Sequence, residues 1–312
     1  GVGAAHHLRV HRVDGARPVQ GDDPQMPPGL DEDGGLGLRC ACRCGGAHRL
    51  RFPFPMLCAV VDGSRRGRSA LALASGRGGR GLALRGHKVG IVDTDIQSPG
   101  IHTLFHVDLN TVTHTLNNYL WGYCGIKDTV LDITDGVKGP DGEPSITGPG
   151  KVFFIPSSIK TGDIARIVKE MYDVEALNRG FMEFCDTMDL DYLLIDTHPG
   201  VNEETLLSIA ISDTLLLILR PDIQDYQGTA VTLELARKLE VPQLFLVVNK
   251  ALETFDFQDL SQRIFSNYRT PVAAVLPLST DLIQIGSTGL IRTLHPDHAF
   301  TRSIETIADS IE

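Results

Sequence analysis

The sequence predicts an α/β protein in which a doubly wound, mostly parallel sheet carries helices on both faces. From about residue 57, apolar strand-like runs alternate with helix-like segments along the chain of 312 residues, an order that favours parallel strands joined by crossover helices. Two runs stay apolar until they end in Asp93 and Asp196, which is typical of strands buried on both faces of a sheet. No apolar run reaches about eighteen residues, so the sequence predicts no membrane-spanning helix.

The individual elements follow from the apolar runs and from the helical spacing of apolar residues. Strands are predicted at Leu57–Val61, Val89–Asp93, Val152–Ile155, Tyr192–Asp196, Thr214–Leu219, Leu244–Asn249 and Val272–Val275. Helices are predicted at Asp163–Met171, Ala176–Thr187, Glu203–Ile211, Gly228–Leu239, Phe257–Tyr268 and Ala299–Ile311. The polar face of the last helix is acidic rather than basic, so we expect this helix to pack on the core and not on a membrane surface.

The first 86 residues differ in composition from the rest of the chain. They contain no Lys, Ile, Thr, Asn or Tyr and hold thirteen Arg against seven acidic residues, whereas the remainder holds sixteen basic and thirty-two acidic residues. A globular domain does not normally exclude five common residue types. We therefore predict a poorly structured, low-complexity arm over residues 1–56 and a folded domain over residues 57–312, clearest from about residue 86. A natural arm and translation of GC-rich DNA in a wrong reading frame both account for the bias.

Acidic residues follow two of the predicted strands. Asp93 and Asp95 come at the end of the second strand, and Asp196 ends the fourth strand before a Thr-His-Pro-Gly turn. Because ligands bind outside the carboxyl ends of the strands in open α/β sheets, these carboxylates are predicted to meet at one edge. Mg²⁺ prefers one or two carboxylates together with phosphate oxygens and water. The alternative is that each Asp only caps the turn or helix that follows it.

Three segments together resemble the MinD/ParA group of ATPases: Val89–Gly100, Asp191–Gly200 and Leu244–Lys250. The resemblance covers roughly residues 57–312 and is strongest from Gly86 onward. It implies a P-loop NTPase-like fold, binding of ATP with Mg²⁺, hydrolysis of ATP to ADP and phosphate, and a nucleotide-dependent homodimer.

The resemblance also implies roles for single acidic and glycine residues. Asp93 and Asp95 match the acidic motif of the second strand, which positions the attacking water and supports Mg²⁺. Asp196 matches the Walker B carboxylate, which holds Mg²⁺ directly or through water. Gly200 matches the glycine whose backbone N–H senses the γ-phosphate.

Further residues correspond to the part of the family's site that surrounds the base. Asn249 matches the Asn that hydrogen-bonds adenine, and an amide suits that role because it can both donate and accept. An Asn that merely starts a turn after a strand is the alternative. Pro221 and Pro277 stand in segments that close the nucleotide pocket in the family.

The phosphate loop departs from the family pattern Lys-Gly-Gly-x-Gly-Lys-Ser/Thr, because the first 87 residues contain no Lys. Two fragments are candidates for this loop, Gly63–Ser69 and the Gly-rich Ser75–Gly81. The chain between Ser69 and the second strand is long enough for a crossover helix, whereas the chain after Gly81 is too short, so Gly63–Ser69 occupies the position of the loop. Gly67, Arg68 and Ser69 then stand where the family binds phosphate, and the Ser69 hydroxyl stands at a Mg²⁺ position. A planar guanidinium at Arg68 is not a conservative replacement for a compact ammonium.

The sequence therefore predicts a MinD/ParA-like ATPase that drives dimerisation-dependent positioning or partition, with its activity impaired by the altered loop. A non-catalytic scaffold or regulator that keeps the fold is the alternative, although the retained carboxylates argue against a long-abandoned site. Cys124 and Cys185 are isolated, which favours a reducing cytoplasm. The net charge of −10 and the lack of a basic patch in residues 87–312 argue against general DNA binding. A protein partner is expected, and its identity is open.

Overall fold

The computed structural model describes residues 56–61, 81–136, 146, 148–170, 172–198, 200–279 and 298–312, with the backbone alone for residues 56–61 and 168. The predicted N-terminal arm, except residue 56, lies outside these ranges. So do the predicted phosphate-loop residues Gly67, Arg68 and Ser69. The helix expected after that loop is described only at its end, where residues 81–84 are helical.

Strands and helices alternate along most of the described chain. The strands are β1 (Met56–Val61), β2 (Lys88–Asp93), β3 (Leu131–Asp132), β4 (Lys151–Ile155), β5 (Tyr192–Asp196), β6 (Thr214–Leu219), β7 (Gln243–Ala251) and β8 (Val272–Pro277). The helices are α2 (Ile101–Leu104), α3 (Leu116–Leu120), the 3₁₀ helix η1 (Ile126–Thr129), α4 (Thr161–Glu170), α5 (Val174–Met188), α6 (Glu203–Ile211), α7 (Ile223–Lys238), α8 (Phe257–Tyr268) and α11 (Ala299–Ile311).

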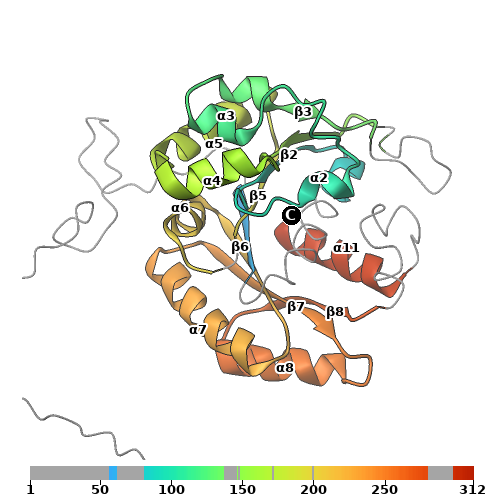
Figure 1. Cartoon of the computed structure of the whole chain (residues 1–312). Coiled ribbons are helices and arrows are strands. Elements are labelled where there is room, and N and C mark those ends of the chain that lie inside the picture. Colours follow the sequence, from blue (N-terminus) through green and yellow to red (C-terminus); the bar gives the residue numbers. More distant parts are fainter. Residues whose placement is uncertain are drawn as a thin grey trace, which may run out of the picture. The chain divides into compact units, whose positions relative to one another are not determined.

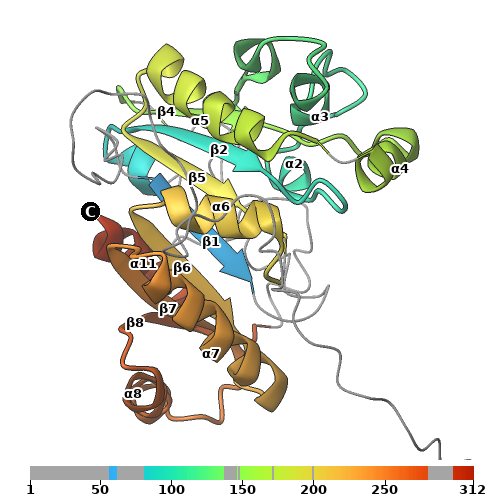
Figure 2. The same cartoon turned by 90° about the vertical axis from the view of Figure 1, so that its left-hand side faces the viewer.

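One sheet holds all the described strands in the order β3-β4-β2-β5-β1-β6-β7-β8. Every neighbouring pair is parallel except β3 with β4, which is antiparallel. The parallel strands β1, β2, β5 and β6 point the same way in Figure 2, so their carboxyl ends share one edge of the sheet. This edge is called the carboxyl edge below.

Helices cover both faces of the sheet (Figure 1). One face packs against α2 and α11, with Ile304 and Ile307 of α11 buried in the same apolar cluster as Ile91 and Leu194. The other face forms two clusters, one with α3, α4, α5 and α6, and one with α7 and α8. Neighbouring residues of a strand therefore enter opposite cores, which explains why the strand sequences are apolar throughout.

The predicted fold class is confirmed, and each predicted strand lies within two residues of the observed one. Helix α7 begins at Ile223, five residues before the predicted start. Asp222 caps its first turn by accepting a hydrogen bond from the N–H of Asp225 at 3.0 Å. The prediction missed α2, α3, η1 and β3 because each spans only two to five residues, too few for a periodic pattern to appear.

The C-terminal helix packs on the core, as expected from its acidic polar face. Phe300 is 2% exposed and belongs to the cluster that covers one side of the sheet. The last turn is held at the opposite, amino edge by Arg85, which forms ion pairs with Asp309 and Glu312. His87 adds a contact at 3.0 Å between its Nε2 and Glu312 Oε1.

Candidate functional site

Three acidic side chains meet at the carboxyl edge of the sheet. Asp93 and Asp196 end the neighbouring strands β2 and β5 and lie directly opposite each other in the register of this pair. Asp95 follows two residues after Asp93, and all three side chains are buried, with exposed fractions of 0%, 3% and 6% for Asp93, Asp95 and Asp196. Burial raises the pKa of Asp196 well above its ordinary value, and the charges of Asp93 and Asp95 raise it further.

The carboxylate of Asp93 organises the loop that follows its own strand. Its Oδ2 accepts hydrogen bonds from the N–H groups of Gly100 and Ile101 at 3.1 and 3.3 Å, and its Oδ1 accepts one from the N–H of Asp95 at 3.2 Å. These bonds lower its pKa, but burial and the nearby Asp95 outweigh them and raise it to about 7. The sequence left open that each Asp caps the turn or helix that follows it, and Asp93 does so through its bonds to the start of α2.

Asp196 is held differently from Asp93. Its backbone carbonyl accepts two hydrogen bonds from Thr94, one from the N–H at 2.9 Å and one from the hydroxyl at 2.5 Å. Its side-chain Oδ1 is buried and has no hydrogen-bond partner within the described residues. A buried carboxylate oxygen without a donor is unfavourable by itself, and it leaves an acceptor that no donor among the described residues satisfies.

The donor set fits a cation that brings its own further ligands. Within the described part of the chain, no group of three or more His, Cys, Asp or Glu residues is arranged to hold a metal ion alone. Mg²⁺ does not require such a cage, because it binds through one or two carboxylates together with phosphate oxygens and waters. Asp196, with its Oδ1 lacking a described donor, and the neighbouring Asp95 supply that smaller set.

Asn249 and Pro277 lie at the same edge, on the opposite side of β1 from the acids. Asn249 lies near the end of β7, is 3% exposed, and uses its Oδ1 to accept a hydrogen bond from the N–H of Lys250 at 2.9 Å. Pro277 ends β8, where it is paired with Ala251 of β7. The strand order places β5 on one side of β1, and β6, β7 and β8 on the other.

Strand β1 lies between the strands that carry the acidic residues and the strand that carries Asn249. Ala59 is paired with Asp196 on one side of β1, and Val61 is paired with Ile218 of β6 on the other. The predicted phosphate-loop residues follow directly but lie outside the described residues. The end of β1 itself lies between the acidic group, which is on the neighbouring strand β5 and the next strand β2, and the predicted base-binding strand β7, which is two strands away.

Gly200 precedes helix α6 and has a φ of 99°. Only glycine adopts this left-handed region readily, so the conformation itself explains the residue. Asn202 then caps α6 by accepting a hydrogen bond from the N–H of Thr205 at 2.7 Å. Gly200, the glycine predicted to sense the γ-phosphate, therefore has a backbone conformation that other residues rarely adopt, between β5 and α6.

Pro221 lies between two residues that share an ion-pair network. Arg220 donates from Nε and Nη2 to the two carboxylate oxygens of Asp225, both at 3.0 Å, and its backbone N–H donates to Asp225 Oδ2 at 2.8 Å. Asp222 pairs with the same guanidinium at 3.1 Å. This network fixes the turn from β6 into α7 at the carboxyl edge.

Sequence reasoning missed the residues that support the acids. Thr94 joins the ends of β2 and β5, and the hydroxyl of Ser157, just after β4, donates to the carbonyl of Asp93 at 2.7 Å. The Arg220–Asp225 pair was also missed, although an Arg before Pro and an Asp in the first turn of a helix were visible. For Thr94 and Ser157 the sequence contains no comparable signal, because their partners are backbone groups of other strands.

Sequence comparison finds relatives of this chain, although no protein-family profile matches it. An uncharacterized ATP-binding protein of Methanocaldococcus jannaschii is 24% identical over 252 residues, which cover 77% of this chain and 86% of that protein. The flagellum site-determining protein YlxH of Helicobacter pylori is 22% identical over 261 residues, or 76% of this chain and 80% of its own length. A cytosolic Fe-S cluster assembly factor of Neurospora crassa is 31% identical over 158 residues, 47% of this chain and 46% of that protein.

Solved structures agree with this chain in fold. The cell division ATPase MinD of Pyrococcus furiosus superposes with a TM-score of 0.65 at 17% identity, covering 83% of this chain and 98% of that one. The septum site-determining protein MinD of Pyrococcus horikoshii, solved with Mg-ADP, gives a TM-score of 0.65 at 15% identity, with coverage of 83% and 96%. At these identities, the superpositions establish a shared architecture.

The chain therefore has a P-loop NTPase fold: a mostly parallel sheet covered by helices on both faces, with the candidate site at its carboxyl edge. The superposed structures are MinD proteins and the sequence relatives include an ATP-binding protein, so the resemblance to the MinD/ParA group predicted from three motifs is confirmed. No helix among the described residues is both long and apolar enough to cross a membrane.

Proposed function

We propose that this chain is a MinD/ParA-like nucleotide-binding protein that takes up Mg-ATP at the carboxyl edge of its sheet. The observation that carries the proposal is the meeting of Asp93, Asp95 and Asp196 at this edge, buried and close enough that Asp95 raises the pKa of Asp93 and both raise the pKa of Asp196. Carboxylates that repel one another in the absence of a cation are the expected state of a site that a divalent ion completes. ATP-binding relatives support the choice of nucleotide.

Each residue has a proposed part in this site. Asp196 and Asp95 would hold the cation, together with the Ser69 hydroxyl predicted from the sequence. Asp93 would keep the loop from Thr94 to Gly100 in place through its three backbone hydrogen bonds. A bound Mg²⁺ would supply positive charge beside the β- and γ-phosphates. Such sites act mainly by positioning and by charge stabilisation rather than by covalent chemistry.

The base and the sugar would lie on the other side of β1. Asn249 lies on β7, and its buried amide carries a donor and an acceptor for the edge of adenine. Pro221 and Pro277 end or follow the flanking strands and would form the walls of the pocket. The nucleotide would thus span the edge from the end of β7 to the ends of β5 and β2.

We propose that hydrolysis of ATP to ADP and phosphate is impaired in this chain. The first 87 residues provide no Lys for the β- and γ-phosphates, and Arg68 takes its place in the sequence. Loss of one charged phosphate contact costs about 1.5–3 kcal/mol, or roughly ten- to a hundred-and-fifty-fold in affinity. Activity at the level of an intact phosphate loop would contradict this part of the proposal.

The test is equilibrium binding of radiolabelled ATP to the full chain, with Mg²⁺ and with a chelator. We expect weak binding that requires Mg²⁺, and its loss in Asp196→Asn. Asp186→Asn, an exposed substitution on α5, is the matched control and should bind as the unmodified chain does. Binding that is equal with and without Mg²⁺, or unchanged in Asp196→Asn, would refute the site.

A separate variant tests the phosphate loop. Arg68→Lys restores the ammonium group, so we expect tighter binding of Mg-ATP if Gly63–Ser69 is the loop. The coding DNA for residues 57–86 gives an independent check, because a one-base shift that restores Gly-Lys-Ser/Thr would identify a reading-frame change. No gain in affinity in Arg68→Lys, together with DNA that lacks such a shift, would argue against this assignment.

We also propose that nucleotide binding favours a homodimer that meets across the carboxyl edge. Ile159, Val201 and Ile223 follow β4, β5 and β6 and are 44%, 39% and 78% exposed. Sedimentation velocity with and without Mg-ATP tests this, and Ile223→Glu should abolish any nucleotide-dependent dimer. Phe265→Glu, an exposed apolar position on α8, is the control. Such a dimer would couple the nucleotide to positioning or partition of a partner.

A further inference from the structure

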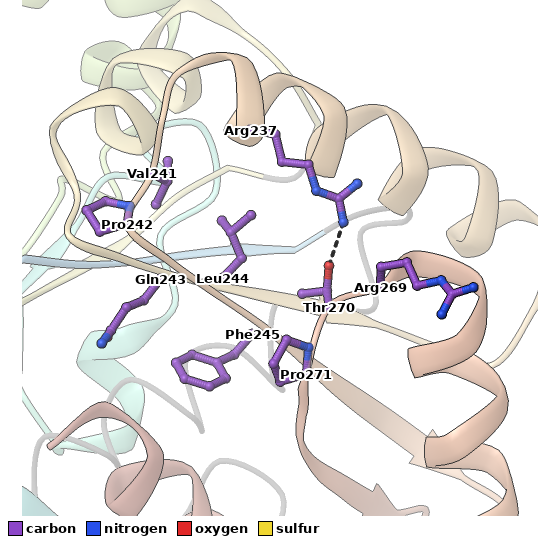
Figure 3. Close-up of a pocket in the computed structure, with 9 residues that line it drawn as sticks. All are labelled: Arg237, Val241, Pro242, Gln243, Leu244, Phe245, Arg269, Thr270 and Pro271. Carbon is purple, nitrogen blue, oxygen red and sulfur yellow. Dashed lines mark hydrogen bonds between the residues drawn. The ribbon is translucent and has the colours of Figure 1, made fainter.

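A hollow of about 350 Å³ lies at the amino edge of the sheet, at the end of β7 that is remote from the candidate nucleotide site. It is formed where α7 and α8 end and β7 and β8 begin (Figure 3). Its lining consists of Arg237, Val241, Pro242, Gln243, Leu244, Phe245, Arg269, Thr270 and Pro271. The volume is within the range of pockets that bind small ligands or peptide side chains.

The charge of this hollow differs from that of the molecule as a whole. Its lining includes two arginines and no acidic residue, although the chain has a net charge of −10. Within the described residues, Arg85, Arg166, Arg179, Arg220 and Arg263 each form an ion pair with a carboxylate. Arg237 and Arg269 are in no such pair there, and both are at the hollow.

The two guanidinium groups are held to different degrees. Arg237 reaches from α7 and donates from Nη2 to the Thr270 hydroxyl at 2.9 Å, and it also donates to the carbonyl of Tyr268 at the end of α8. Both bonds come from Nη2, and within the described residues the N–H groups of Nε and Nη1 make no hydrogen bond. Arg269 follows α8 with a φ of 54° and is exposed, and its side chain extends outward beside Thr270 in Figure 3.

The rest of the lining is mainly apolar. Val241, Pro242, Leu244, Phe245 and Pro271 provide no side-chain hydrogen-bonding group, and the two prolines also lack a backbone N–H. A bare inorganic anion would leave this surface uncovered. An occupant that places carboxylates on the arginines and an apolar group on Leu244 and Pro271 would use both parts of the hollow.

We propose that this hollow is a docking site for an acidic peptide segment of a partner protein, in which an apolar residue stands next to acidic ones. Arginine binds carboxylates through paired N–H donors, and such charge-assisted bonds give both strength and direction. Gln243 at the hollow and Asn249 at the nucleotide edge are six residues apart on β7, about 20 Å along a strand. The partner and a nucleotide can therefore bind the same molecule at once, and the proposal does not depend on nucleotide binding.

The experiment measures fluorescence anisotropy of a labelled, end-blocked peptide Glu-Leu-Phe-Glu with the full chain at low ionic strength. Two matched probes separate charge from apolar contact: Gln-Leu-Phe-Gln lacks the carboxylates, and Glu-Ser-Ser-Glu lacks the apolar side chains. We expect the first peptide to bind most tightly, with about tenfold or greater losses in affinity for both other probes. Added salt should weaken the binding, because exposed charges are screened.

Variants of the chain locate the site. Arg237→Gln and Arg269→Gln should each weaken binding of Glu-Leu-Phe-Glu by about tenfold. Arg263→Gln, on the exposed side of α8 where Arg263 pairs with Asp259, should leave it unchanged. Arg237 also supports the end of α8, so Arg237→Gln could be unstable. In that case Arg269→Gln is the decisive variant, because it breaks no described side-chain bond. Equal binding of all three peptides, or unchanged binding in Arg269→Gln, would overturn the proposal.

Competition identifies the class of occupant. Inorganic phosphate, glutarate and a short DNA duplex are each added to the complex of the chain with Glu-Leu-Phe-Glu. The proposal requires that none displaces the peptide at concentrations near that of the peptide itself. Displacement by phosphate or glutarate would make this a small-anion site, and displacement by DNA would make it a nucleic-acid contact. Either result would overturn the peptide assignment.

Discussion

Among single residues, Asp196 shows how the fold places a carboxylate in an environment that disfavours its charged form. Its carboxylate is buried and close enough to Asp93 and Asp95 for their charges to act on it, and its Oδ1 has no hydrogen-bond donor among the described residues. Burial and like charges both raise its pKa, as they raise that of Asp93 from 3.8 to about 7. The folded state therefore binds these protons more tightly than the unfolded state does. The free energy of unfolding should fall as the pH rises from about 4 through 7.

We predict that Asp196→Asn stabilises the protein at about pH 8 when neither nucleotide nor Mg²⁺ is present. The substitution removes a buried negative charge, and we expect a gain of about 1–2 kcal/mol in the free energy of unfolding. Urea unfolding at about pH 8 and about pH 5 measures this, and the gain should be smaller at the lower pH, where the acid is already protonated. A loss of stability at about pH 8 would show that Asp196 has a favourable partner.

The two cysteines outside the N-terminal segment provide a second test at this scale. Burial, with a smaller effect of Asp186, raises the pKa of the Cys185 thiol to about 12, and burial followed by Asp128 raises that of Cys124. The thiolate is the reactive form, so a raised pKa lowers reactivity. We predict that iodoacetamide at about pH 8 leaves Cys185 unmodified in the native chain and labels Cys124 slowly. Peptide mass mapping checks this, and fast native labelling of Cys185 would contradict its burial.

At the scale of elements, short polar networks set the turns that form the carboxyl edge. Asp93 accepts hydrogen bonds from the backbone of the loop before α2, and Thr94 donates to β5 from the end of β2. Asp225 accepts hydrogen bonds from Arg220 just before α7. Each network links the end of a strand to the element that follows or flanks it. The positions of the candidate ligands therefore depend on residues that do not face the ligand.

We predict that Asp225→Ala destabilises the protein by about 2–4 kcal/mol, because it leaves the Arg220 N–H and guanidinium without their main acceptor. Asp225 is 1% exposed, so water does not replace it easily. The control is Glu234→Ala on the same helix, which breaks only an exposed pair with Lys238. Thermal unfolding should separate the two variants clearly. Equal melting temperatures would mean that the Arg220–Asp225 pair does not stabilise the β6–α7 turn.

Helix α11 acts at the scale of the whole molecule, because it covers one face of a sheet formed by distant segments. Its buried residues join a cluster that includes residues of β2, β4, β5, β6, β7 and β8. The helix also contacts the start of β2 through Arg85 and His87. The last residues of the described chain therefore contact residues that lie more than two hundred positions earlier in the sequence.

We predict that Phe300→Ala lowers the free energy of unfolding by about 3–5 kcal/mol. Phe300 is 2% exposed and lies in the cluster beneath α11. Thr306→Ala, an exposed change on the same helix, controls for effects on the helix itself. Chemical unfolding followed by circular dichroism measures both variants. A Phe300→Ala effect as small as that of Thr306→Ala would mean that α11 is not part of the cooperative core.

The arrangement of strands explains why the sequence was informative about the site. Asp93, Asp196 and Asn249 lie at or near the carboxyl ends of parallel strands in one sheet, so a sequence pattern that identifies the strands also places these residues at a common edge. Asp93, Asp196 and Asn249 were identifiable in this way. The supporting roles of Thr94 and Ser157 were not, because each bonds a backbone carbonyl of a strand that is distant in sequence. The hollow at Arg237 and Arg269 also depends on how α7 and α8 end in space.

The sequence by itself determined the α/β class, most strand and helix positions and the acidic strand ends, because buried parallel strands need nearly continuous apolar runs. It also determined the break in composition before residue 87 and the absence of a Lys from the expected phosphate loop. Only the tertiary structure decided the strand order, which places β1 between the acids and Asn249, and the burial that raises the pKa of Asp93 and Asp196. Strand order and burial arise from contacts between segments far apart in the chain, and local sequence patterns do not encode them.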